Sequence, residues 1–297
     1  MVEVQGLSRH GRGLRFGVIG SPIQHSLSPL LHRTAYRELG IGHAGYEAYE
    51  VPAGTLAAFW EHGPGARLDG ASITMPGKPE ALALATEADA VSQRLGIANT
   101  LLRLPGGGSR AENHDVHGII RALREQGAGA AGPIGEGAVL GSGATALSAT
   151  AALLELGVRT VVLSARRPDR LAPLQDLVAD AGARAVLVPW EQSHRILGSP
   201  VVVSALALEG ALSLAGEWAT RSDLPTPGIF LDVLYEPWPA PLAGLLGERG
   251  ASVVSGLEML LHQADMQLRS MLGIDAAPLD AMRDAARHEL ARRTHQA

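Results

Sequence analysis

The sequence predicts an α/β fold with two domains, each built around a mainly parallel sheet. Its 297 residues are too many for one small domain and are enough for two hydrophobic cores. The hydrophobic fraction of 46% and the charged fraction of 19% are those of a folded globular protein. Short apolar runs alternate along the chain with stretches of helical spacing, which is the pattern of successive βαβ units.

The first third of the chain contains four strand-like runs, each followed by a helical or turn segment. Strands are expected at residues 16–19, 46–51, 70–74 and 99–104, and helices at 30–39, 55–60, 80–84 and 89–95. The glycines at 106–108 predict a hairpin turn after the last of these strands.

The rest of the chain repeats the alternation after a helix at 118–126 and a glycine-rich connection at 127–137. Further strands are expected at 138–140, 160–163, 186–188, 201–204 and 229–233. A helix that ends near residue 156 follows the first of these strands, and amphipathic helices at 255–271 and 280–293 close the chain.

Composition excludes several classes of function. The net charge of −5 and the absence of a Lys/Arg block give no sign of a nucleic acid or an anionic membrane as partner. The chain has no cysteine, which excludes disulfides and thiol nucleophiles. Residues 1–15 contain no apolar core of signal-peptide length, and no apolar run reaches about 18 residues, so a cytoplasmic location is expected. The single lysine, Lys78, is notable because lysine, unlike arginine, can give up its proton in a protein.

A glycine-rich turn between the strand at 138–140 and the following helix predicts a nucleotide site. Gly141 permits a tight turn, Gly143 lets the backbone approach a pyrophosphate, and Ala146 allows close packing of helix and strand. The free N–H groups of the helix N-terminus would then face the phosphates. The predicted contacts are Gly141, Ser142, Gly143, Ala144, Thr145 and Ala146, in a Rossmann-type domain.

The next strand ends without the carboxylate that would bind the ribose hydroxyls of NAD. Ser164 is followed by the guanidinium groups of Arg166, Arg167 and Arg170. A guanidinium can bind two oxygens of a 2′-phosphate at once, so NADP is the expected cofactor, with Asp169 as a competitor for the arginines.

Six motifs, in order and with compatible spacing from residue 16 to about 273, resemble the shikimate dehydrogenase family. They are Gly17-Val18-Ile19-Gly20-Ser21-Pro22 with Ser26-x-Ser28-Pro29, Ser72-Ile73-Thr74-Met75-Pro76-Gly77-Lys78, Ala98-Asn99-Thr100, Asn113-His114-Asp115-x-x-Gly118, Asp232-Val233-x-Tyr235-x-Pro237 and Gly256-x-x-Met259-Leu260-x-x-Gln263. The Met-Pro-Gly-Lys variant is similar to that of enzymes from high-GC actinobacteria.

The resemblance implies hydride transfer between NADP and shikimate or 3-dehydroshikimate, a step in the biosynthesis of chorismate and the aromatic amino acids. Lys78 and Asp115 match the catalytic pair, and Ser26 and Ser28 match the residues that hold the substrate carboxylate. Thr74, Asn99 and Gln263 match residues that bind ring hydroxyls, and Tyr235 lies in a motif near them. Ser164, Ser204, Leu206 and Gly256 are further expected cofactor contacts.

The same resemblance implies that the C-terminal helices return to the first domain. The expected substrate domain comprises residues 1–116 and 255–297, the expected NADP domain comprises 117–254, and a cleft is expected between them. No metal is expected, since the 11 histidines form no HExxH pattern. The assembly is expected to be a monomer or a homodimer.

Three positions depart from the family pattern. His114 replaces the usual Thr, Glu112 stands where Gly is common, and 204–208 (Ser-Ala-Leu-Ala-Leu) replaces Asn-x-Thr-Pro-x-Gly-Met. A dehydrogenase for quinate or an amino-substituted analogue, with NADP or NAD as cofactor, stays open as an alternative. A catalytically silent NADP-binding regulator is the alternative from another class.

Overall fold

The computed structural model describes residues 13–295, and the contacts between Cα atoms divide the chain into two compact units. Unit 1 comprises Met1–His114 and Gln263–Ala297, and unit 2 comprises Asp115–His262. The expected α/β class with two domains is confirmed. The domain limits expected after residues 116 and 254 stay a prediction.

Unit 1 contains a mixed six-stranded sheet in the order β2-β1-β3-β5-β6-β4. Its strands are β1 (Leu14–Gly20), β2 (Ala44–Glu50), β3 (Gly70–Ile73), β4 (Glu87–Ala88), β5 (Thr100–Arg103) and β6 (Ser109–Glu112). The first three strands pair in parallel, and β5 is antiparallel to both β3 and β6. The expected hairpin turn joins β5 to β6, where the N–H of Leu104 donates to the carbonyl of Gly108.

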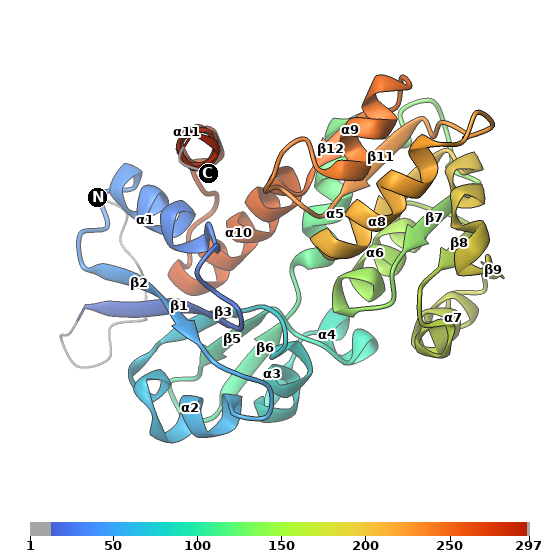
Figure 1. Cartoon of the computed structure of the whole chain (residues 1–297). Coiled ribbons are helices and arrows are strands. Elements are labelled where there is room, and N and C mark those ends of the chain that lie inside the picture. Colours follow the sequence, from blue (N-terminus) through green and yellow to red (C-terminus); the bar gives the residue numbers. More distant parts are fainter. Residues whose placement is uncertain (1–12, 296–297) are drawn as a thin grey trace. The chain divides into compact units, whose positions relative to one another are not determined.

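The helices of unit 1 come from both the first part and the last part of the described chain. They are α1 (Ser28–Glu38), α2 (Leu56–His62), the 3₁₀ turn η1 (Pro64–Arg67), α3 (Lys78–Leu84), α4 (Ala90–Leu95), the second part of α10 (Gly256–Leu272) and α11 (Leu279–Thr294). Helix α11 packs against α1, as Figure 1 shows. The C-terminal helices therefore do return to the unit that holds the first strands.

Unit 2 contains a fully parallel six-stranded sheet in the order β12-β11-β10-β7-β8-β9. Its strands are β7 (Glu136–Leu140), β8 (Thr160–Ser164), β9 (Arg184–Leu187), β10 (Val201–Ser204), β11 (Ile229–Asp232) and β12 (Ser252–Ser255). The strand order reverses between β7 and β10, which is the topological switch point of a Rossmann-type sheet and the place where such sheets bind nucleotides.

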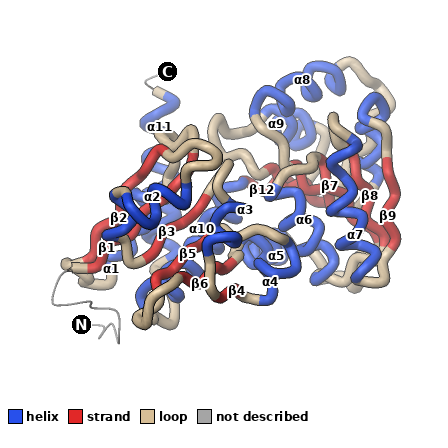
Figure 2. The backbone as a smooth tube through the Cα atoms, turned by 90° about the horizontal axis from the view of Figure 1, so that it is seen from below, coloured by secondary structure: helices blue, strands red, loops and turns tan. Residues whose placement is uncertain are grey.

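Helices cover both faces of this sheet. They are α5 (Asp115–Glu125), α6 (Ala144–Glu155), α7 (Ala172–Asp180), α8 (Leu208–Ala219), α9 (Pro241–Glu248) and the first part of α10, with 3₁₀ turns η2 (Pro168–Leu171) and η3 (Trp190–Gly198). Figure 2 shows α8 and α9 on one side of the sheet and α5, α6 and α7 on the other. Trp218 of α8 and Phe230 of β11 are fully buried in the core under α8 and α9.

Two element boundaries differ from the sequence-based expectation. The strand expected at 186–188 is β9, which starts at Arg184, because its pairing with β8 begins at Thr160. Ser255, expected to start the last long helix of this region, instead ends β12, because its backbone pairs with Asp232 of β11. Among residues 13–295, no helix is both long and apolar enough to cross a membrane.

Candidate active site

The turn after β7 has the backbone that a phosphate-binding loop requires. Gly141 has φ +122°, and a Cβ atom there would lie 2.9 Å from the carbonyl oxygen of Ala205, so only glycine fits. A Cβ atom on Gly143, by contrast, would meet no protein atom within 4 Å. Packing within the protein therefore does not require glycine at 143, and the open space beside it leaves room for a ligand. Ser142, Ala144, Thr145 and Ala146 complete the loop and the first turn of α6.

The end of β8 carries cationic groups and no acid. Ser164 is the last residue of the strand and is buried, whereas Arg166, Arg167 and Arg170 are exposed. Within the described part of the chain, no carboxylate forms an ion pair with these three guanidinium groups, although Asp169 lies beside them in sequence. Three guanidinium groups without an ion-pair partner among the described residues suit the 2′-phosphate of NADP better than the two free ribose hydroxyls of NAD.

The segment after β10 departs from the family pattern but keeps its contact with the glycine loop. The N–H of Ala205 donates to the carbonyl of Leu140 at 2.8 Å, and its own carbonyl faces Gly141. Leu206 packs at the edge of the apolar core, and Ser204 is fully buried. A backbone hydrogen bond therefore holds the segment to the switch point in the absence of the family's Thr-Pro pair.

Gly256, expected as a cofactor contact, has a structural requirement of its own. A Cβ atom at this position would lie 2.0 Å from the carbonyl oxygen of Val233, in the loop after β11. The start of α10 thus packs backbone to backbone against this loop, and Tyr235, two residues further along the loop, is half-buried. Glycine here brings the Asp232–Pro237 motif and the Gly256–Gln263 motif together.

Lys78 and Asp115, the expected catalytic pair, are both buried first residues of helices. Lys78 begins α3 after the turn at 74–77 and is 8% exposed, and its carbonyl accepts the N–H of Ala98 at 3.0 Å. Asp115 begins α5 and is 4% exposed. Thr74, the half-buried first residue of this turn, donates its N–H to the carbonyl of Ile19 in β1. The sheet of unit 1 therefore fixes the backbone from which Lys78 projects.

Asn99 and Gln263, two expected hydroxyl-binding residues, are in direct contact although 164 positions separate them. The side-chain amide of Asn99 donates to Oε1 of Gln263 at 3.2 Å. Oδ1 of Asn99 accepts from the hydroxyl of Thr100 at 2.9 Å and from the N–H of His114 at 3.0 Å. The structure thus locks the orientation of the Asn99 amide.

A second glutamine on α10, which the sequence did not single out, supports this pair. Nε2 of Gln267 donates to the carbonyl of Asn99 at 3.1 Å and to the hydroxyl of Thr100 at 3.0 Å. Its Oε1 accepts from the hydroxyl of Ser72 at 2.8 Å, which in turn accepts from the hydroxyl of Tyr46 at 2.6 Å. The only sequence signal was the spacing of Gln263 and Gln267, which places both on one face of a helix.

The serine loop before α1 is ordered by its own hydrogen bonds. Oγ of Ser26 accepts the N–H of Ser28 at 3.3 Å, and Ser28 is the first residue of α1, with Pro29 in the first turn. Ser28 is buried and Ser26 is half-buried. On the strand side, the hydroxyl of Ser21 donates to Glu50 at 2.5 Å. The two serines expected to hold a carboxylate therefore lie together at the N-terminus of α1.

Glu112 and His114, two of the departures from the family pattern, form a buried pair with each other. Nε2 of His114 lies 3.0 Å from Oε2 of Glu112, while Oε1 of Glu112 lies 3.0 Å from Nε of Arg110. Burial alone would raise the pKa of Glu112, but hydrogen bonds from His114 and Ser270 and the positive charges of His114 and Arg110 outweigh it and lower that pKa. The two departures from the family pattern therefore contact each other immediately before Asp115.

Asp232, the last residue of β11, is fully buried with one carboxylate oxygen unsatisfied. Oδ1 accepts the N–H of Leu234 at 3.1 Å, but Oδ2 has no hydrogen-bond partner within the described residues. Burial raises the pKa of Asp232 to about 7, and the Leu234 N–H lowers it only in part. The carboxyl group at the C-terminal end of β11 therefore lies in surroundings that favour its neutral form.

The parallel sheet with its glycine loop, and a second α/β unit whose helix α3 begins with the buried lysine, define a two-domain α/β protein with a Rossmann-type nucleotide-binding unit. Residues 18–101 match the family described as the shikimate dehydrogenase substrate binding domain. An NADP(+)-type shikimate dehydrogenase of Synechococcus sp. (strain JA-3-3Ab) is 31% identical over 284 residues, which cover 93% of this chain and 94% of that protein. The chain belongs to the shikimate dehydrogenase family.

Solved structures agree with this assignment. The shikimate dehydrogenase of Mycobacterium tuberculosis is 39% identical with a TM-score of 0.79, covering 92% of this chain and 99% of its own. The Thermus thermophilus enzyme, solved in complex with NADP(H) and shikimate, is 29% identical with a TM-score of 0.77, covering 93% of this chain and 99% of its own.

Proposed function

We propose that this protein is an oxidoreductase that interconverts shikimate and 3-dehydroshikimate with NADP as hydride carrier. One observation carries the proposal beyond family membership. The Asn99–Gln263 hydrogen bond at 3.2 Å joins two of the expected substrate residues, in the same unit as the chain's single lysine. Ser26 and Ser28, also in this unit, are proposed to hold the ring carboxylate, and Thr74, Asn99 and Gln263 its hydroxyls, with Tyr235 nearby.

The proposed chemistry divides one alcohol oxidation between two acceptors. When bound, NADP accepts the hydride from the ring carbon, or returns it in the reverse direction. The side chain of Lys78 takes the hydroxyl proton as the carbonyl forms and gives it back during reduction. Asp115 is proposed to direct the Lys78 ammonium group. A shielded lysine suits this step because it can exist in both protonation states, whereas arginine effectively cannot.

The proposed cofactor residues follow the end of the parallel sheet from β7 to β10. The loop 141–146 is proposed to hold the pyrophosphate, and Arg166, Arg167 and Arg170 the 2′-phosphate. Ser164, Ser204, Leu206 and Gly256 would contact the rest of the dinucleotide. Support comes from the forced glycine at 141, the open space at 143 and the unpaired guanidinium groups.

The test is turnover by the purified protein, followed by the absorbance of the reduced nicotinamide. The assay compares NADP with shikimate, NAD with shikimate, and NAD with quinate. Preference for the first combination supports the proposal, whereas preference for quinate or for NAD favours the alternative dehydrogenases. Cofactor binding without any turnover would identify a silent regulator.

Lys78→Met tests the proton-transfer role directly. We expect turnover to fall by about 10²–10⁴-fold, the usual contribution of a general acid–base group, while NADPH still binds. Arg94→Met, on the neighbouring helix α4, is the control for removing a cation. Turnover that is unchanged in Lys78→Met would remove this residue from the mechanism.

A cytoplasmic enzyme acting as a monomer or a homodimer completes the proposal. The proposed location rests on the composition of the chain, and the assembly stays a prediction. Sedimentation of the purified protein at several concentrations would distinguish the two assemblies.

A further inference from the structure

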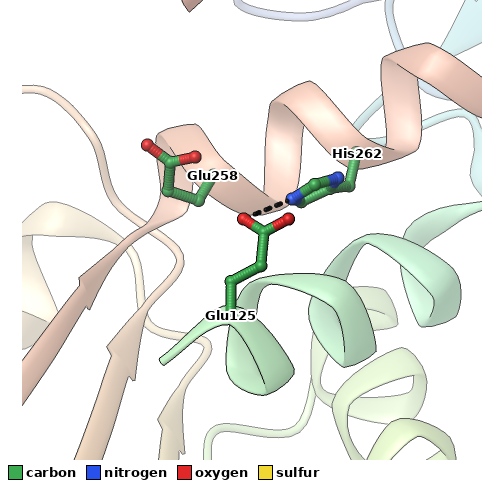
Figure 3. Close-up of side chains that lie close together, drawn as sticks. All are labelled: Glu125, Glu258 and His262. Carbon is green, nitrogen blue, oxygen red and sulfur yellow. Dashed lines mark ion pairs between the residues drawn. The ribbon is translucent and has the colours of Figure 1, made fainter. Parts of the chain in front are cut away.

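Three potential metal ligands converge inside unit 2, apart from every residue assigned above. Glu125 is the last residue of α5, and Glu258 and His262 are four residues apart on α10. One ligand atom from each of the three lies within 4.8 Å of the other two. Figure 3 shows Glu125 reaching from the end of α5 toward α10, where its carboxylate faces the ring of His262.

The four-residue spacing explains why two ligands come from one helix. Residues at i and i+4 lie one above the other on the same face of an α-helix, so Glu258 and His262 present their side chains in the same direction. The third ligand, Glu125, is placed by tertiary packing. On the strand side, the amide of Gln126 donates to the hydroxyl of Ser252 at the start of β12 and holds the end of α5 in place.

The imidazole of His262 supplies an independent reason to expect a ligand. The residue is 2% exposed, and its Nε2 atom has no hydrogen-bond partner among the described residues. Oε2 of Glu125 lies 3.0 Å from Nε2, within ion-pair distance but outside hydrogen-bond geometry. A buried ring nitrogen without a directional partner is costly, and a coordinated cation would satisfy it.

The local charges also favour a cation. The two carboxylates of the cluster carry like charges, which repel at this separation. Arg121 lies 3.4 Å from Oε1 of Glu125, which leaves Oε2 as the oxygen nearest His262. A divalent ion would neutralise the two carboxylates, and the one further positive charge, on Arg121, lies on a half-exposed side chain where solvent and salt screen it.

We propose that Glu125, Glu258 and His262 bind one divalent transition-metal ion, with Zn²⁺ as the best-suited ion and water completing its coordination. One nitrogen and two carboxylate oxygens are common zinc ligands, with bonds of about 2.0–2.2 Å. Tetrahedral ligands at that distance are about 3.4 Å apart, so the glutamates must close in slightly. Glu125 and Glu258 are not fully buried and can do so. The ion would tie α5 to α10.

The test is titration of the EDTA-treated full chain with ZnCl₂, measured by calorimetry and by thermal unfolding without substrate or cofactor. We expect one strong site and a rise in the unfolding temperature, because an ion that binds only the folded state stabilises it. Glu258→Gln keeps the size of a partly exposed side chain and should weaken binding at least tenfold, as should His262→Gln. His62→Gln is the matched control, since His62 lies 3.7 Å from Glu61 in an exposed pair.

A second readout reports on the ligands themselves. Co²⁺ in place of Zn²⁺ should give visible absorption bands in the wild type and in His62→Gln, and these bands should be lost in Glu258→Gln. Equal Zn²⁺ affinity in the wild type and Glu258→Gln, or no site of one-to-one stoichiometry, would overturn the proposal. Because neither measurement involves turnover, this result is independent of the proposed dehydrogenase activity.

Discussion

Replacing His114 by Thr, the residue usual in the family, tests whether the Glu112–His114 pair stabilises this chain. The substitution leaves the Glu112 carboxylate, only 4% exposed, without its partner at 3.0 Å. Removing one member of a fully buried pair costs about 3–5 kcal/mol. The cost here should be smaller, because Arg110 still lies 3.0 Å from the other oxygen of Glu112 and is itself half exposed. We therefore expect a loss of about 1–3 kcal/mol in the free energy of unfolding.

Urea unfolding at neutral pH measures this loss, and a double-mutant cycle isolates the pair. Glu112→Ala alone should also destabilise, and the double variant Glu112→Ala/His114→Thr should lose about 1–2 kcal/mol less than the sum of the single variants. Strict additivity would refute the view that the two departures compensate one another. An unchanged urea midpoint in His114→Thr would refute the stabilising contact itself.

The same pair predicts a dependence on pH. The folded-state pKa of Glu112 is lowered, so its contribution to stability is present above the unfolded pKa of about 4.3 and is lost as the pH falls through the folded value. The difference in stability between the wild type and Glu112→Ala should therefore shrink on acidification below about pH 4. A difference that stays constant down to about pH 2 would contradict the lowered pKa.

Three further predictions concern single sites. Gln267→Ala should raise KM for shikimate and lower the free energy of unfolding by about 2–3 kcal/mol, because Asn99 and Ser72 lose buried hydrogen bonds. The exposed control Gln192→Ala should change neither quantity. Asp232, with its pKa raised to about 7, contributes stability that is complete below about pH 4 and is lost as the pH rises through 7. The free energy of unfolding of Asp232→Asn, taken relative to the wild type, should therefore be up to about 4 kcal/mol higher at about pH 8 than at about pH 4. Urea unfolding at the two pH values measures this change, and a difference that does not depend on pH would count against the raised pKa. Gly141→Ala should lose about 2 kcal/mol of stability as well as NADP affinity, whereas Gly143→Ala should lose NADP affinity alone. Urea unfolding measures the stability of the two variants, and calorimetry measures their affinity for NADP. Equal stability of both variants would contradict the strained turn at 141.

Some of the support for the candidate site could be read only from contacts distant in sequence. The spacing of Glu112 and His114 is local, and alternate residues of a strand end share one face, so their pairing was within reach of sequence reasoning. Gln267 and Ser72 were not, because nothing in the sequence places residues 195 positions apart within 2.8 Å. The roles of Lys78 and Asp115 stay a prediction that the assays above would test.

The sequence by itself determined the α/β class, the glycine loop after β7 and the cationic end of β8, because each depends on residues that are neighbours along the chain. Hydrophobic periodicity and turn-forming residues act over only a few positions, so they can be recognised directly from the order of residues along the chain. Only the tertiary structure decided that α10 supplies Gln263 and Gln267 to Asn99, and that His262 meets Glu125. Those contacts form when burial of apolar surface brings distant segments together, and the burial of side chains does not specify in advance which polar groups will meet.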